Sequence, residues 1–263
     1  MASNRIRVLV VGCSSGVGLE VVKTLLTEGD RLQVFGLVRN QRRAAKALDY
    51  GSSRVHFIHG NVTKPETLVP ACQGMDAVVC TVRARAGCRL PCWNRDSPRC
   101  VEYEGVKDLA EAAASVGVPK FVLVSAAGVT TTCGGEFCLN IFHGRALHWK
   151  LLGEEALRRS YKHGGLRDLS YYIIRPGRLS NNLGGLLGCS FEQGDQGRGS
   201  ITRIDVAAIV VACIDGHCIP NVTFEAFNNK NKLAPAEDLN KFYFLDPDEP
   251  VAEGAEITSR LLP

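Results

Sequence analysis

The sequence predicts an α/β protein in which helices cover both faces of a doubly wound parallel sheet, with a small C-terminal lobe on the substrate side. Short runs of β-branched residues alternate with longer segments of helical periodicity, a pattern typical of parallel strands joined by crossover helices. A glycine-rich turn separates the first such strand from the first helix. Because one hydrophobic core can organise 263 residues, we expect a single domain over residues 1–263.

Seven segments have the composition and length of strands. Each is short and rich in β-branched or aromatic residues. They comprise residues 6–11, 32–38, 55–60, 77–81, 121–125, 171–175 and 222–227. Pro176 and Gly177 are expected to stop the sixth strand, and the seventh is expected at the edge of the sheet.

Four helices are predicted from apolar residues that recur every three or four positions. The first helix follows the first strand and ends at Gly29, and the others span residues 101–116, 145–161 and 205–214. The glycine-rich segment 184–199 is predicted to be a mobile loop. Residues 177–200 and 228–263 are expected to form the substrate-side lobe.

Composition and charge exclude several classes of protein. Hydrophobic residues make up 45% of the chain and charged residues 22%, which are the values of an ordinary globular protein. The net charge of +4 comes from scattered basic residues, so nucleic acid is not an expected partner. The longest apolar run, Val206 to Ile214, has nine residues, whereas a membrane-spanning helix needs roughly 20. We expect a soluble, cytoplasmic protein without a membrane span, as a monomer or weak homodimer.

The chain contains eleven cysteines, which a reducing compartment would keep as free thiols. Several of them cluster in loop-like stretches, namely Cys88, Cys92, Cys100, Cys133 and Cys138. None of their spacings forms the paired CxxC motif of a structural zinc site. We therefore expect no metal, and thiols that are prone to oxidation where they are exposed.

The turn between the first strand and the first helix has the pattern of a dinucleotide-binding loop. It consists of Gly12, Cys13, Ser14, Ser15, Gly16, Val17 and Gly18. Glycines let the backbone approach a pyrophosphate, and the helix N-terminus presents N–H groups and the positive end of its dipole. An ordinary glycine-rich turn is the alternative. Because this turn opens the first strand–helix–strand unit, we favour cofactor binding.

Arg39 ends the second strand, 21 residues after Gly18. An acidic residue at this position would bind the ribose 2′-hydroxyl of NAD. A guanidinium pairs instead with the 2′-phosphate of NADP, and Arg42 and Arg43 follow within one helical turn. The sequence therefore predicts NADPH in preference to NADH, with solvated arginines at a helix start as the alternative.

These motifs resemble those of the atypical short-chain dehydrogenases/reductases, a Rossmann-type group of single-domain NAD(P)-binding proteins that includes NmrA-like proteins and flavin or quinone reductases. The resemblance extends to about Phe227. The matching segments are VVGCSSGVG, LVRN, GNVTKPETL, DAVVCT, VEYEGVKDLAEAAASVGVPKFVLVSAAGV, WKLLGEEALRRS, YYIIRPGRL and SITRIDVAAIVVACI.

The resemblance implies roles for residues that follow the strands. Asn61 and Val62 match the segment that borders the adenine, although the family more often has aspartate at Asn61. Thr81 and Val82 match the strand end beside the adenine ribose. On the nicotinamide side, the matching residues are Ser125 with Ala126 near the ring, Lys150 at the ribose, and Pro176 with Gly177 at the amide.

The sequence departs from the wider superfamily at the position of the usual catalytic tyrosine, four residues before the lysine. That position is Ala146. On a helix, His148 would point about 200° away from the face of Lys150, and His143 would lie two turns before Lys150. A phenolic proton donor is thus missing, which argues against ordinary alcohol dehydrogenation.

Two functions remain open from the sequence. The first is an NADPH-dependent oxidoreductase that transfers hydride to a quinone, a flavin or a related small acceptor. In it, Lys150 and Ser125 orient the nicotinamide ribose and the substrate, while Arg178 and residues 184–199 shape the acceptor site. The second is a non-catalytic NADP-binding protein that senses redox state or acts in assembly, a reading that Ala146 favours.

Overall fold

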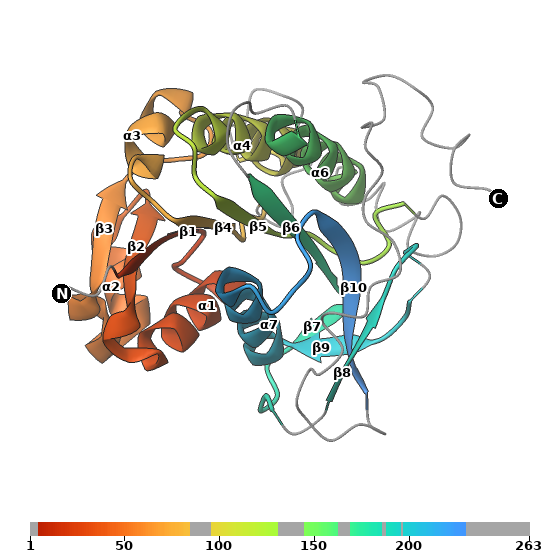
Figure 1. Ribbon diagram of the computed structural model, residues 1–263. Coiled ribbons are helices and arrows are strands. Elements are labelled where there is room, and N and C mark those ends of the chain that lie inside the picture. Colours follow the sequence, from red (N-terminus) through yellow and green to blue (C-terminus); the bar gives the residue numbers. More distant parts are fainter. Residues whose placement is uncertain are drawn as a thin grey trace.

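The computed structural model describes residues 5–84, 96–130, 145–162, 169–185, 188–195 and 197–229. Within them, an eight-stranded sheet forms the middle layer of the molecule (Figure 1). In spatial order its strands are β3 (Val55–His59), β2 (Leu32–Val38), β1 (Ile6–Val11), β4 (Ala77–Cys80), β5 (Lys120–Val124), β6 (Ser170–Pro176), β10 (Val222–Asn229) and β8 (Gly188–Glu192). All neighbouring strands are parallel except β10 and β8, which are antiparallel.

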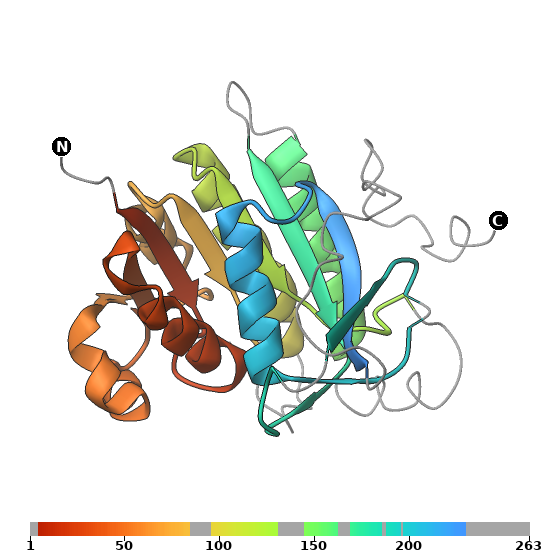
Figure 2. The same cartoon turned by 60° about the horizontal axis from the view of Figure 1, so that its bottom comes forward.

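Helices cover both faces of this sheet, as the doubly wound prediction requires (Figures 1 and 2). The helices α1 (Gly16–Thr27) and α7 (Arg203–Asp215) pack side by side on one face. The other face carries α3 (Leu68–Cys72), α4 (Gly105–Ser115) and α6 (Ala146–Lys162). The helix α2 (Gln41–Leu48) follows β2, and β7 (Arg178–Ser180) pairs with β9 (Ser200–Thr202) in a separate two-stranded sheet.

Short helical turns complete the connections between these elements. They are η1 (Gly29–Arg31), η2 (Asp49–Arg54), η3 (Pro65–Thr67) and the π-helical η4 (Arg99–Glu104). The predicted helix 101–116 therefore consists of two parts, η4 and α4, because the chain is more loosely wound before Gly105.

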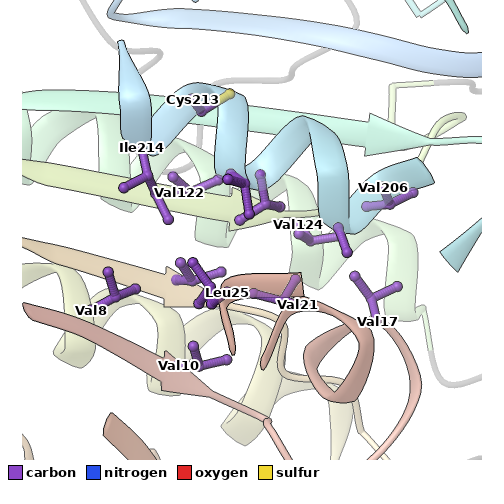
Figure 3. Packing of buried hydrophobic residues seen from close by; sticks show 14 of the residues in the cluster. Val8, Val10, Val17, Val21, Leu25, Val122, Val124, Val206, Cys213 and Ile214 are labelled. Carbon is purple, nitrogen blue, oxygen red and sulfur yellow. The ribbon is translucent and has the colours of Figure 1, made fainter. Parts of the chain in front are cut away.

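The two faces of the sheet have separate hydrophobic cores, which explains the continuous apolar runs of its strands. Side chains of β1 alternate between them, so that Val8 and Val10 pack toward α1 and α7 while Leu9 and Val11 pack toward α3 and α4. Figure 3 shows the first core, where Val21 of α1 lies between β1 and α7.

The structure corrects two predictions for the C-terminal half. The strand at 222–227 is not at the edge of the sheet, because β8 pairs with its outer side through the register Phe227 to Ser190. The segment 184–199 is not a continuous loop, because it contains β8. This strand has five residues and begins with a glycine, so its own sequence indicates little strand character.

None of the helices in the described residues combines the length and the apolar character needed to cross a membrane. The strand order also locates the most favourable site for a ligand. The chain adds β2 and β3 on one side of β1 and then continues the sheet with β4 on the other side of β1. A crevice for ligands is expected at the carboxyl ends of the strands beside such a switch point.

Candidate functional site

The residues predicted to bind a cofactor gather at the carboxyl edge of the parallel sheet. Each strand from β1 to β6 ends next to one predicted group. In order, these groups are Gly12 to Gly18 after β1, Arg39 after β2, Asn61 and Val62 after β3, Thr81 and Val82 after β4, Ser125 after β5, and Pro176 with Gly177 at the end of β6. Lys150 joins them from the first turns of α6.

The three glycines of the first turn have different structural surroundings. Gly12 has a φ of +94°, and a Cβ on it would lie 2.7 Å from Oγ1 of Thr81. A Cβ on Gly18 would collide with the carbonyl oxygen of Gly12. Gly16 differs, because its φ is +60° and its Cβ would meet no atom within 4 Å. Gly12 and Gly18 therefore allow close packing, whereas Gly16 leaves open space in front of α1.

The N-terminus of α1 is suited to bind an anion. Ser15 is the N-cap, but its side chain makes no capping hydrogen bond, and the first turn holds no acidic residue. This end of α1 thus presents the N–H groups of a first turn and the positive end of the helix dipole without a side-chain cap. Ser14 is half-buried, Ser15 is exposed, and Val17 is buried in the core.

Arg39 has a partner that the sequence analysis missed. Its Nη1 donates to Oδ1 of Asp96 at 2.6 Å. Asp96 lies just before η4, 57 residues further along the chain. Arg42 and Arg43 are exposed at the start of α2, where Asn40 accepts a hydrogen bond from the backbone N–H of Arg43.

The residues after β3 and β4 make contacts that shape the turns. Asn61 Oδ1 accepts from the backbone N–H of Thr63 at 3.2 Å, and Val62 is buried beneath α4. Thr81 Oγ1 donates to the carbonyl oxygen of Val11 at 2.9 Å, which fixes the end of β4 against the end of β1. Val82 is half-buried and packs against the same core as Val62.

Lys150 lies beside a buried carboxylate, Glu102 of η4. Their Nζ and Oε1 atoms are 3.9 Å apart, and the Glu102 side chain is 2% exposed. The same oxygen of Glu102 accepts from the backbone N–H of Ala84 at 3.0 Å, while its Oε2 has no hydrogen-bond partner. Glu102 therefore connects the segment after β4 with the lysine. The sequence predicts a regular helix over residues 101–116, and the π-helical winding of η4 was not foreseen.

A buried network of charges lies behind Ser125. Glu154, one helical turn beyond Lys150, binds Arg175 of β6 at 2.7 Å and Arg158 at 3.3 Å. Burial alone would raise the pKa of Glu154, but the two guanidinium groups lower it below its ordinary value. Ser125 donates its backbone N–H to the carbonyl oxygen of Ile174 at 2.8 Å, and its buried hydroxyl, which makes no hydrogen bond of ordinary geometry, interacts with Glu154 and helps to lower the pKa of that carboxyl.

The turn after β6 is held by neighbouring backbone. Pro176 accepts from the N–H of Ala127 at 2.9 Å, and Gly177 donates to Ala226 at 3.1 Å. A Cβ on Gly177 would lie 2.6 Å from the ring of Phe227, so this glycine is required by packing against β10. Arg178 is exposed at the start of β7.

The position of the usual tyrosine, four residues before Lys150, carries a side chain that is neither an acid nor a base. Ala146 begins α6 and is half-buried. The His148 ring meets the Trp149 ring edge-on at 5.1 Å, and burial together with Arg145 lowers its pKa. His143 and the cysteines at 88, 92, 133 and 138 lie outside the described residues. Within those residues, no group of three or more His, Cys, Asp or Glu side chains could hold a metal ion.

Comparisons with known proteins identify the family to which the chain belongs. Residues 12–217 match the NAD(P)H-binding family model. Sanguinarine reductase of Eschscholzia californica is 28% identical over 258 residues, covering 85% of this chain and 89% of the reductase. Photosystem II assembly factor Ycf39 of a Synechocystis strain is 37% identical over 119 residues, which are 45% of this chain and only 33% of that relative.

Solved structures show the same fold. The oxidoreductase ylbE of Lactococcus lactis superposes with a TM-score of 0.67 at 22% identity, covering 87% of this chain and 93% of that one. The mostly parallel sheet, its flanking helices and the glycine turn at the end of β1 are thus those of a Rossmann-type fold. With the family model spanning most of its length, the chain belongs to the NAD(P)H-binding family, among the atypical short-chain dehydrogenases/reductases.

Proposed function

We propose that the protein is an NADPH-dependent oxidoreductase that reduces a quinone, a flavin or a related small acceptor. The observation that carries this proposal is the pairing of a retained Lys150 with buried Glu102, on a helix that has an alanine in place of the usual tyrosine. Sanguinarine reductase, a relative over most of its length, supports a reductase activity.

The residues present fit a dinucleotide along the whole carboxyl edge. The open space at Gly16 and the uncapped N-terminus of α1 suit the pyrophosphate. Arg39 lies at the end of β2, where a 2′-phosphate would find a guanidinium and no acidic residue of that strand. At the other end of the site, the buried hydroxyl of Ser125 makes no hydrogen bond of ordinary geometry, so a ligand could provide one.

The chemistry requires hydride transfer and one proton. When bound, NADPH supplies the hydride from its nicotinamide ring. Lys150, held by Glu102, would donate hydrogen bonds to the nicotinamide ribose and fix the ring relative to the acceptor. With Ala146 in place of a phenol, the proton comes from water, which suits an acceptor whose reduced form is a stabilised anion. Quinones and flavins are acceptors of this kind.

A second candidate function is NADP binding without turnover, in redox sensing or in assembly. The similarity of 119 residues to an assembly factor favours it, as does Ala146. The two functions differ in one observable: both bind NADPH, and only the first consumes it in the presence of an acceptor.

The test is NADPH oxidation, followed by its absorbance, with quinones, flavins and small carbonyl compounds as acceptors. We expect quinones or flavins to be reduced faster than simple ketones. Lys150→Ala should lower kcat about 10-fold or more, because a misplaced nicotinamide reacts poorly, whereas Ala146→Tyr should change quinone reduction little. Tight NADPH binding without turnover of any acceptor would favour the second function, and efficient oxidation of secondary alcohols would contradict the first.

Cofactor preference has its own test. Arg39→Asp should remove or reverse the preference for NADP⁺ over NAD⁺, because the new carboxylate repels a 2′-phosphate and accepts a hydrogen bond from a 2′-hydroxyl. Isothermal titration with both dinucleotides measures this. Equal affinities of the unaltered protein for the two dinucleotides would contradict the assignment of NADPH.

A further inference from the structure

The ion pair between Arg39 and Asp96 lies across the switch point of the sheet. Arg39 follows β2 on one side of β1, and Asp96 precedes η4 in the connection that leaves β4 on the other side of β1. Their Nη1 and Oδ1 atoms are 2.6 Å apart, and the two side chains are 56% and 32% exposed. The pair therefore connects the segments after β2 and β4, where the proposed function places the adenosine of the dinucleotide.

We propose that Asp96 is a specificity-determining residue that weakens the preference for a 2′-phosphorylated dinucleotide by competing for Arg39. This inference rests on the proposed function. A carboxylate and a phosphate use the same guanidinium donors, so a 2′-phosphate that takes up the Nη1 group of Arg39 has to displace Asp96 from it. A dinucleotide with a free 2′-hydroxyl brings no charge to this position and gains nothing from that exchange.

The surrounding charges make Asp96 the relevant competitor. Among the ion pairs of the described residues, the carboxylate that pairs with Arg39 is that of Asp96. The nearest comparable pair in sequence, Arg99 with Glu104 at 2.8 Å, is formed within η4 itself. Once displaced, the Asp96 carboxylate remains close to the incoming phosphate and repels it. Both effects oppose NADP binding and leave NAD binding unchanged.

The test compares Asp96→Asn with Glu104→Gln, which removes one negative charge from the same region without touching Arg39. NADP⁺ and NAD⁺ are titrated separately into each protein at low ionic strength. Because the lost pair is exposed, we expect Asp96→Asn to tighten NADP⁺ binding about two- to fivefold, with NAD⁺ binding unchanged. Glu104→Gln should leave both affinities as they are.

A second arm shows whether the effect passes through Arg39. In an Arg39→Ala background, Asp96→Asn should no longer tighten NADP⁺ binding, and raised salt should shrink its effect in the unaltered background.

Three results would overturn the inference: unchanged or weaker NADP⁺ binding in Asp96→Asn, equal tightening for both dinucleotides, or the same gain in Glu104→Gln. These differ from a failure of the proposed function, which would show as an unaltered protein that binds NADPH without oxidising it in the presence of any acceptor, or that binds neither dinucleotide.

Discussion

Gly16 combines a backbone conformation that favours glycine with empty space where a side chain would lie. The positive φ of +60° would strain any residue with a Cβ. A Cβ at this position would meet no atom within 4 Å, so the glycine is not required to avoid a clash within the protein. Gly29 at the other end of α1 offers a matched case, with a φ of +68° and equally open surroundings. The two positions differ in what the space is used for.

We therefore expect Gly16→Val and Gly29→Val to lower the free energy of unfolding by similar amounts, about 1–2 kcal/mol each. Only Gly16→Val should abolish dinucleotide binding, because its side chain occupies the space that the pyrophosphate needs. Urea unfolding and NADPH titration of both variants measure the two effects. If Gly16→Val binds NADPH as well as Gly29→Val does, the turn has only a structural role.

Among the helices, the contact between α6 and η4 places Lys150. Gly153 of α6 faces the carbonyl oxygen of Glu102, and a Cβ at this position would overlap that oxygen. The close approach of the two backbones brings Lys150 to Glu102 one turn earlier on α6. This contact could not be read from the sequence, in which Gly153 is one glycine inside an apparently regular helical pattern.

The sign of a stability change tests this contact. In a helix with free space, Gly→Ala raises the free energy of unfolding by roughly 0.5–1 kcal/mol. We expect Gly153→Ala to lower it instead, by about 1–3 kcal/mol, because α6 and η4 have to move apart. The urea midpoint measures the change. An increase in stability would show that α6 and η4 are not in close contact at Gly153.

Across the whole molecule, buried charges join elements that are distant in the sequence. Glu225 of β10 lies 3.7 Å from Arg175 of β6 and accepts at 2.9 Å from the backbone N–H of Asp195. Asp195 in turn accepts from the N–H groups of Gly128 and Thr130 after β5. Burial raises the pKa of Glu225 from 4.5 to about 7; Arg175 and the backbone N–H of Asp195 oppose this shift, and the negative charge of Asp195 adds to it.

This raised pKa predicts a pH dependence of stability. Between pH 4.5 and about pH 7 the native state holds a proton on Glu225 that the unfolded chain has lost, so the contribution of Glu225 to stability falls as the pH rises. Glu225→Gln lacks this loss and keeps an acceptor for Asp195. The variant should gain about 1–2 kcal/mol relative to the unaltered protein between pH 5 and pH 8. A difference in the free energy of unfolding between the two proteins that does not change with pH over this range would contradict the prediction.

The sequence by itself determined the strands of the parallel sheet to within one or two residues, the glycine turn, and the family. These features depend on local patterns: apolar runs of strand length, helical periodicity, and glycines at a strand–helix junction. The helices α1, α6 and α7 were predicted correctly for the same reason. Local patterns failed for β8, because an antiparallel edge strand depends on its neighbour β10 more than on its own composition.

Only the tertiary structure decided which side chains meet. Asp96 and Glu102 were not expected as partners of Arg39 and Lys150, since each pair joins segments that lie 57 and 48 residues apart. Their pairing follows from the sheet, which brings the carboxyl ends of its parallel strands to one edge, and from the π-helical winding of η4. The sequence specifies which groups are available at that edge. Their charge balance depends on distances that no local pattern encodes, because electrostatic interactions act between residues that only the fold brings close together.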